Sequence, residues 1–155
     1  MSSKRIAIAT DHAAVDERML VAEHLRAQGH DVIDLGCAAG EACDYPDQAA
    51  LVANAVADGK ADFGVLICGT GIGVAMSACK VNGIRAATIG DEFSAEMTRR
   101  HNDANVACFG ARILSATAMM RMTDIFLATP FDGGRHERRV NKINALESEC
   151  PDPVS

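Results

Sequence analysis

Short runs of β-branched and other apolar residues alternate with helical patterns from one end of the chain to the other. The runs Arg5–Thr10 and Phe63–Cys68 are apolar on both faces, which is typical of parallel strands covered on both sides. Three further runs have the length and composition of strands, namely Asp31–Leu35, Arg85–Ile89 and Val106–Phe109. Five strands that alternate with helices predict an α/β fold built on a five-stranded parallel sheet.

The intervals between the predicted strands carry helix signals. Ala14–Gln28 has an apolar stripe and stops before Gly29, a residue type that often ends helices. The other predicted helices are one with Pro46 in its first turn, Gly73–Lys80, Glu92–Asn102, one capped by Ser115 that runs to Leu127, and Arg135–Glu149. This order predicts a Rossmann-like, doubly wound three-layer sandwich. We expect one domain at residues 1–150 and a frayed C-terminal tail at residues 151–155.

The chain has 155 residues and a formal net charge of −6 at pH 7. An acidic chain is a poor general nucleic-acid binder, since neutralising phosphates requires a basic surface. No window approaches 18 consecutive apolar residues, and no signal-like apolar segment precedes the first strand. We therefore expect a soluble, cytoplasmic protein that binds neither nucleic acid nor membrane.

The six cysteines are spread along the chain, at Cys37, Cys43, Cys68, Cys79, Cys108 and Cys150. No pair has the C-x-x-C spacing and no histidine cluster accompanies them, so we expect no metal site. An even number of cysteines is weak support for disulfides in a chain without a secretion signal. Free thiols are therefore the expectation.

The first predicted strand leads directly into Asp11 and His12. Ligands of doubly wound sheets bind beyond the carboxyl ends of the strands, so these two polar side chains are candidates for the site. Either can hydrogen-bond a ligand hydroxyl, and His12 can meet a phosphate. The alternative is an Asp that caps the next helix beside a solvated His.

The third predicted strand leads into Cys68-Gly69-Thr70-Gly71-Ile72-Gly73 and then a helix. Alternate glycines let the backbone approach a ligand, and amides at a helix start attract negative charge. Cys68 is therefore a candidate nucleophile or base, with Thr70 and the following amides as an oxyanion cradle. The alternative is an inert core thiol. The loop matches neither the dinucleotide fingerprint nor the Walker motif, which disfavours nicotinamide and ATP chemistry.

Two further segments carry titratable or basic side chains. His101 lies in the polar stretch Arg99–Asn105 and can move protons near neutral pH, although a solvated or capping His is the alternative. Arg135 and Arg139 are four residues apart on the last predicted helix, so they share a face that suits a phosphate. A solvated basic face is the alternative there.

Together these motifs resemble the ribose-5-phosphate isomerase B (ribose/galactose isomerase) family over nearly the whole chain. The matching motifs are Asp11-His12, Asp44-Tyr45-Pro46, Cys68-Gly69-Thr70-Gly71-Ile72-Gly73, Asn82-Gly83-Ile84-Arg85-Ala86, His101-Asn102-Asp103, Phe109-Gly110-Ala111-Arg112 and Gly133-Gly134-Arg135-His136. Each motif is modest alone, whereas their order and spacing are specific. The resemblance implies an aldose–ketose isomerase that acts on a sugar phosphate, such as ribose 5-phosphate, without a metal or an organic cofactor.

The resemblance also implies a role for each matching residue. Cys68 matches the base of the cysteine-type branch, and no carboxylate of the alternative branch occurs in Val74–Ser77. His101 matches the ring-opening acid, with Asp11 assisting it. The implied phosphate ligands are His12, Arg135 and Arg139. The further implied substrate contacts are Tyr45, Asn102, Arg112, Gly69, Thr70, Gly71, Ile72 and Gly73. The family implies a homodimer or a dimer of dimers whose active sites are shared between subunits.

Departures from the family pattern leave other functions open. Ala14 stands where members often have Gly, and the segment Gly36–Cys43 beside Tyr45 is unusual. The same chemistry on a tetrose or hexose phosphate (erythrose, erythrulose, allose or galactose phosphate) is one alternative. A catalytically silent subunit of a heteromeric isomerase is another. A receiver- or flavodoxin-like domain is disfavoured, because a receiver needs a phospho-accepting Asp where Cys68 stands.

Overall fold

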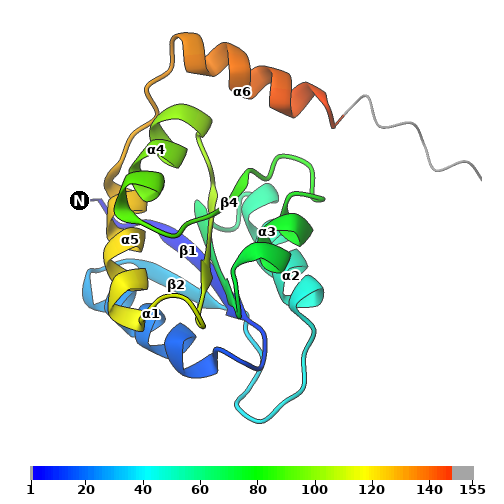
Figure 1. Cartoon of the computed structure of the whole chain (residues 1–155), viewed down its shortest axis with the longest axis vertical. Helices are drawn as coiled ribbons and strands as arrows, with labels where there is room; N and C mark the ends of the chain where they lie inside the picture. The colour runs from blue at the N-terminus through cyan, green and yellow to red at the C-terminus, as the bar shows by residue number, and fades with distance from the viewer. Residues whose placement is uncertain (1, 148–155) are drawn as a thin grey trace, which may run out of the picture.

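Residues 2–147 are described by the structure, a computed structural model. They contain a five-stranded parallel sheet with the strand order β2-β1-β3-β5-β4 and helices on both of its faces (Figure 1). The strands are β1 (Arg5–Thr10), β2 (Asp31–Asp34), β3 (Phe63–Cys68), β4 (Ala86–Thr88) and β5 (Val106–Gly110). The helices are α1 (Val15–Ala27), α2 (Tyr45–Ala57), α3 (Ile72–Ala78), α4 (Glu92–Asn102), α5 (Ala116–Ala128) and α6 (Arg135–Ala145). The predicted α/β sandwich is confirmed.

The predicted elements agree with the observed ones except at their ends. β1, β3 and α4 have the predicted limits, and Ser115 caps α5 by accepting the Ala118 amide at 3.2 Å. β4 is shorter than predicted, and α6 ends at Ala145. The predicted continuation of α6 is wrong at Leu146 and Glu147, which form a turn after the helix, and its last part, residues 148–149, lies outside the described residues. The predicted domain limit at residue 150 and the tail at residues 151–155 also lie outside them. None of the helices in residues 2–147 combines the length and the apolarity that crossing a membrane requires.

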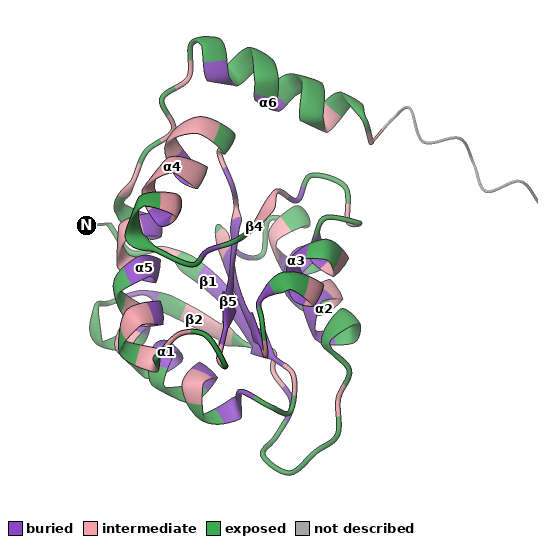
Figure 2. Ribbon diagram, in the orientation of Figure 1, coloured by how far each residue is buried: buried purple, intermediate pink, exposed green. Residues whose placement is uncertain are grey.

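The two faces of the sheet enclose two separate cores, because successive side chains of a strand point to opposite faces. Ile6 and Ile8 of β1 pack in the core that α1, α4 and α5 cover. Ala7 and Ala9 pack in the core that α2 and α3 cover. Figure 2 shows these buried strands between the helical layers, whereas α6 lies on α4 and is exposed along most of its length.

The loop between β2 and α2 is closed by a disulfide between Cys37 and Cys43. The expectation of free thiols is therefore wrong for this pair. The reason is tertiary, because the loop folds back until both sulfur atoms contact the carbonyl oxygen of Thr10, at 3.8 and 3.9 Å. Three cysteines of the described chain remain free, Cys68, Cys79 and Cys108, and Cys150 lies outside it.

A buried histidine at the start of β2 makes stability depend on pH. His30 Nδ1 accepts the Lys4 amide at 3.2 Å, and Nε2 is buried without a partner. Burial, and then the charge of Lys4, lower the pKa of His30. The unfolded chain thus binds more protons than the folded chain near the ordinary histidine pKa of about 6.5, so the free energy of unfolding falls as the pH drops through this value.

We expect the midpoint of urea unfolding to decrease from pH 7.5 to pH 5.5, and to decrease less in His30→Asn. An equal decrease in both proteins would contradict this origin.

Candidate active site

The carboxyl ends of β1 and β3 lie side by side, and the connections that follow these two strands run in opposite directions. β2 lies beyond β1 and β5 beyond β3, so the crevice between these connections opens at the carboxyl edge of the sheet. Asp11 and His12 follow β1, and the loop Gly69–Gly71 follows β3. The sheet order therefore brings together two of the segments that the sequence singles out.

The loop after β3 holds Cys68 at the mouth of this crevice. Cys68 is buried, at 4% exposure, and its Sγ accepts the Gly71 amide at 3.2 Å. Gly71 adopts a left-handed conformation with a φ of 78°, and a Cβ there would lie 2.8 Å from the Phe109 carbonyl carbon. A side chain at Gly110 would likewise lie 2.6 Å from the Thr70 carbonyl carbon. Both glycines are thus needed for the loop after β3 to pack, backbone against backbone, on the end of β5.

Two amides of the predicted oxyanion cradle donate within the loop itself. The Gly71 amide binds Cys68 Sγ, and the Ile72 amide donates to Thr70 Oγ1 at 3.3 Å. The loop is therefore organised around the thiol of Cys68 rather than around a free ring of amides.

A pocket of about 520 Å³ opens beside Cys68, within the range of small-ligand sites. Its walls contain nine of the predicted site residues, Asp11, His12, Tyr45, Cys68, Gly69, Thr70, Ile72, Gly73 and Arg112. Gly71 belongs to the same loop, and the Arg112 amide donates to the Gly69 carbonyl at 3.0 Å. Ala13 and Met76 also line the pocket and were not predicted. The spacing of four residues between Ile72 and Met76 on one helix is the signal that points to Met76.

The opposite wall of the pocket comes from the segments after β1 and β2. Asp11 Oδ1 accepts the Ala13 amide at 3.0 Å, so this carboxylate forms a local turn, and α1 begins without a side-chain cap. His12 is exposed, and its Nδ1 lies 3.2 Å from the Cys43 carbonyl oxygen. Tyr45 lies against the start of α3, where a Cβ at Gly73 would approach its ring to 2.6 Å.

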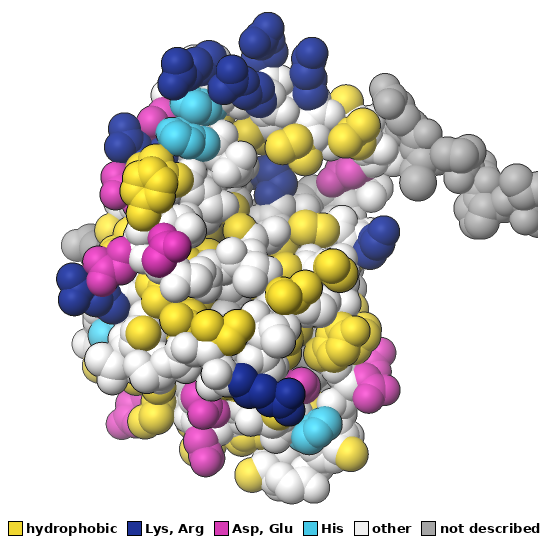
Figure 3. All heavy atoms as spheres, viewed as in Figure 1, with side chains coloured by type: hydrophobic (Ala, Val, Ile, Leu, Met, Phe, Trp, Pro, Cys, Tyr) yellow, Lys and Arg dark blue, Asp and Glu magenta, His cyan; other side chains and the backbone are white. Residues whose placement is uncertain are grey.

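The remaining predicted site residues lie toward the amino end of β5, away from the carboxyl end of the sheet where Cys68 lies. His101 and Asn102 end α4, just before β5 begins at Val106, whereas Cys68 pairs with the last residue of β5. The five residues of β5 separate these positions by roughly 13 Å, at about 3.3 Å per residue. Arg135 and Arg139 are on α6, which packs on α4, and Figure 3 shows Lys and Arg side chains gathered over α6. Within one chain, the fold thus divides the predicted site residues into two groups.

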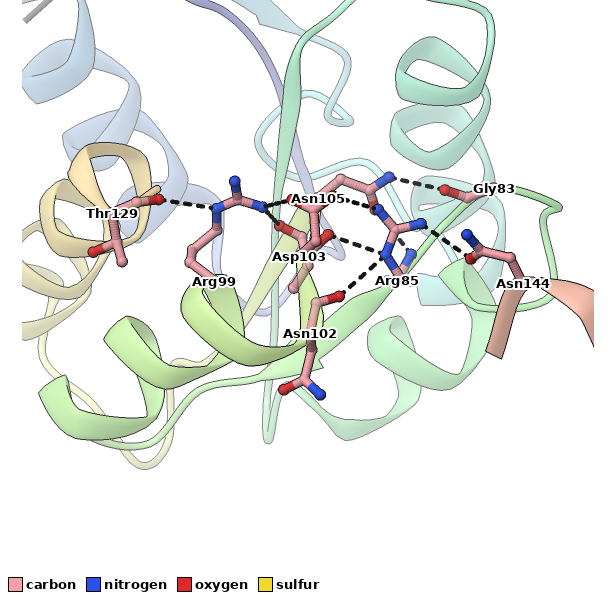
Figure 4. Close-up of polar contacts among 9 residues, drawn as sticks. Gly83, Arg85, Arg99, Asn102, Asp103, Asn105, Thr129 and Asn144 are labelled. Atoms are coloured by element: carbon pink, nitrogen blue, oxygen red, sulfur yellow. Dashed lines mark hydrogen bonds and ion pairs between the residues drawn. The ribbon is translucent and has the colours of Figure 1, made fainter. Parts of the chain in front are cut away.

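A network of polar contacts fixes the end of α4 that carries His101 and Asn102 (Figure 4). Asp103 adopts a left-handed conformation with a φ of 46° and forms ion pairs with Arg99 at 2.8 Å and Arg85 at 3.3 Å. Arg85 Nε donates to the Asn102 carbonyl at 3.2 Å, and its Nη1 donates to Asn144 of α6 at 3.2 Å. Sequence reasoning missed the positioning role of both arginines. The partners of Arg85 come from separate elements, whereas the spacing of four residues between Arg99 and Asp103 was a local signal that pointed to their ion pair.

His101 stacks on His136, with ring centroids 4.3 Å apart and planes 8° from parallel. Burial, and then the neighbouring His101 and Arg135, lower the pKa of His136. With Asp132 these histidines form a group, within residues 2–147, whose ligand-type atoms lie within 4.8 Å of one another. Arg100 Nε contacts both Asp132 carboxylate oxygens at 3.1 Å, so a cation at this group competes with a guanidinium. The sequence does not reveal this group, because its members come from α4, from α6 and from the segment before α6.

The sequence matches known proteins along almost its whole length. Residues 6–143 match the family model described as Ribose/Galactose Isomerase. The chain is 42% identical over 144 residues to ribose-5-phosphate isomerase B of Escherichia coli, covering 93% of this chain and 97% of that protein. It is 39% identical over 145 residues to D-erythrulose-4-phosphate isomerase of Pectobacterium atrosepticum, covering 93% of this chain and 95% of that protein.

The fold of this chain is also similar to solved structures. Ribose-5-phosphate isomerase B of Clostridium thermocellum superposes with a TM-score of 0.92 at 41% identity, covering 94% of this chain and 98% of that one. The enzyme of the same name from Mycoplasma genitalium, solved with bound ribulose-5-phosphate, superposes with a TM-score of 0.89 at 41% identity. That match covers 94% of this chain and 97% of that one.

Proposed function

This chain belongs to the ribose/galactose isomerase family, and from that membership we propose that it interconverts ribose 5-phosphate and ribulose 5-phosphate with Cys68 as the base. The observation that supports the assignment of the base is the position of Cys68. Its thiol lines the pocket beside Asp11, Thr70 and Arg112, and its sulfur accepts an amide hydrogen. This position lets the thiol reach a substrate bound in the pocket, which is the geometry that a general base requires.

The isomerisation moves one proton between neighbouring carbons. In the open-chain aldose, the Cys68 thiolate takes the proton from C2, and the C2–H electrons form an enediolate with the charge on O1. The Cys68 thiol then returns the proton to C1 while the proton of the C2 hydroxyl moves to O1, so that C2 becomes the ketone, O1 becomes a hydroxyl and the thiolate is regenerated. Thr70 and Arg112 line the same pocket, so a hydroxyl and a positive charge are available to the enediolate oxygens.

Ring opening and phosphate binding are assigned to the other matching residues. His101 protonates the ring oxygen and Asp11 assists at the neighbouring hydroxyl, because imidazole exchanges protons near neutral pH. His12, Arg135 and Arg139 hold the phosphate, with the two arginines one helical turn apart on α6. Tyr45, Asn102 and Gly69–Gly73 contact the sugar.

The two groups of residues meet in a homodimer. Each pocket needs the Cys68 group of one subunit and the His101 group of the other, since one chain holds them at opposite edges of its sheet. A groove of about 490 Å³ beside the edge strand β4 offers a surface for the second copy. Asn102 lies on its wall together with the apolar side chains of Ile84, Ile143 and Leu146.

The cytoplasmic location stays a prediction from the sequence.

A tetrose phosphate is the second candidate substrate. The match to a D-erythrulose-4-phosphate isomerase at 39% identity favours it, as does the unusual segment Gly36–Cys43 next to Tyr45. A shorter sugar uses the same proton transfer and differs only in the distance from C1 to the phosphate.

The test is ketose formation by the purified protein in the presence of a chelator, with ribose 5-phosphate, erythrose 4-phosphate and allose 6-phosphate compared at equal concentration. We expect the highest kcat/KM on ribose 5-phosphate. A higher value on the tetrose or hexose would replace the substrate and keep the reaction. Turnover of none of these sugars would overturn the proposal and favour a silent subunit that needs a different partner chain.

A further inference from the structure

The disulfide-closed segment Gly36–Cys43 packs against the chain segment that carries His12 into the pocket wall. It leaves β2, reverses direction at Ala38–Glu41, and returns to Asp44 at the start of α2. Both disulfide sulfurs contact the carbonyl oxygen of Thr10, the last residue of β1. A disulfide sulfur carries no hydrogen, so these are packing contacts against the strand end from which His12 projects.

The Cys43 carbonyl decides which nitrogen of His12 carries the proton. It lies 3.2 Å from His12 Nδ1, and a carbonyl oxygen only accepts hydrogen bonds. Nδ1 must therefore hold a proton, and Nε2, the second ring nitrogen, can donate to a phosphate oxygen when it is protonated as well, in the imidazolium form. A backbone acceptor that fixes a histidine in this way sets both its tautomer and its ring orientation.

The Cys37 end of the segment is anchored in the body of the protein. Arg18 is buried, its Nη1 donates to the Cys37 carbonyl at 2.8 Å, and its Nε forms an ion pair with Asp34 at 3.2 Å. Its guanidinium fills the space that a side chain at Gly36 would need. By contrast, Gly40 and Glu41 between the cysteines are exposed. Arg18 therefore holds the backbone at Cys37 in place, and the disulfide ties Cys43 covalently to this held position.

We propose, on the basis of the function proposed above, that the Cys37–Cys43 disulfide positions His12 for the substrate phosphate, and that its reduction by a thiol weakens substrate binding. Two external thiols reduce the bond, giving two cysteine thiols and one external disulfide. The Cys43 carbonyl is then free to move with the exposed turn, and His12 loses its fixed acceptor. Cys68 and its loop are not part of the segment, so the proton-transfer step is unchanged.

The experiment compares the oxidised protein, the same protein after dithiothreitol, and Cys37→Ser/Cys43→Ser. We expect KM for ribose 5-phosphate to rise about threefold to tenfold in the reduced protein and the double variant, the effect of losing about one hydrogen bond. kcat should stay within about twofold, and dithiothreitol should not affect the double variant. Cys108→Ala, which removes a free thiol that lines neither the pocket nor the groove, is the control that should respond to dithiothreitol like the wild type.

His12 itself provides the readout that a merely structural effect does not move. In a His12→Gln background, oxidised and reduced proteins should have the same KM. Imidazole ¹⁵N shifts should show the Nδ1–H tautomer of His12 in the oxidised protein and a mixture after dithiothreitol. This measurement does not need turnover, so it separates failure of the positioning role from failure of the proposed isomerase. Equal KM values and an unchanged tautomer, or no Cys37–Cys43 link in a peptide map of the oxidised protein, would overturn the inference.

Discussion

Replacing Cys68 with Ala is expected to lower kcat for ribose 5-phosphate by about 10²- to 10⁴-fold, the range that a positioned general base contributes. KM should change little, because the phosphate and hydroxyl contacts are made by other side chains. The measurement is the steady-state formation of ketose by the purified variant, with binding of ribulose 5-phosphate followed by calorimetry. Retained binding with lost turnover is the signature of a missing base.

Cys108 provides a matched control for this substitution. It is a free thiol on β5, fully buried in the same core as Cys68. Burial raises the pKa of Cys108 well above its usual range, so it stays protonated at neutral pH and cannot act as a base. Cys108→Ala should keep the wild-type kcat. Equal losses in both variants would point to a packing effect, and full activity in Cys68→Ala would remove Cys68 from the mechanism.

Two inactive variants are expected to restore activity when they share a dimer. Cys68→Ala removes the base and His101→Asn removes the ring-opening acid, each from a different edge of the sheet. After denaturation and joint refolding, half of the dimers should be mixed, and each mixed dimer should contain one site with both native groups. The mixture should therefore recover about a quarter of the wild-type specific activity, because statistical pairing leaves about one site in four intact.

The control pairs Cys68→Ala with Asp11→Asn. Both residues line the same pocket of one chain, so every site of the mixed dimer carries one defect and no activity should return. Recovery in this control, or no recovery with His101→Asn, would show that the site is not divided between subunits in the proposed way.

The strands and the glycine loop were predictable because their signals are local. Runs that are apolar on both faces give β1 and β3 their limits, and Ser115 caps α5 with its own hydroxyl. General rules for α/β sheets place the residues that follow the strands at the carboxyl ends of the sheet, where Asp11 and Cys68 lie, whereas the strand order was not predicted. Nine predicted residues share a pocket for that reason.

The features that were missed depend on contacts between distant segments. The Cys37–Cys43 bond forms because a loop folds against Thr10, and no spacing rule describes that approach. The Arg85–Asp103 ion pair joins residues 18 positions apart, and the stacking of His101 on His136 depends on how α6 lies on α4. Hydrophobic periodicity predicts where helices and strands begin and end, but it does not predict contacts between distant segments.

The backbone-to-backbone contact of Gly71 and Gly110 with their neighbours divides the pocket into a fixed wall and an adjustable one. The fixed wall carries Cys68, and a side chain at either glycine would force apart the loops that hold it. The adjustable wall carries His12, which contacts the partly exposed loop between β2 and α2, and Tyr45, which follows that loop. A family with this division can evolve new sugar preferences by varying one wall while it inherits the chemistry unchanged on the other.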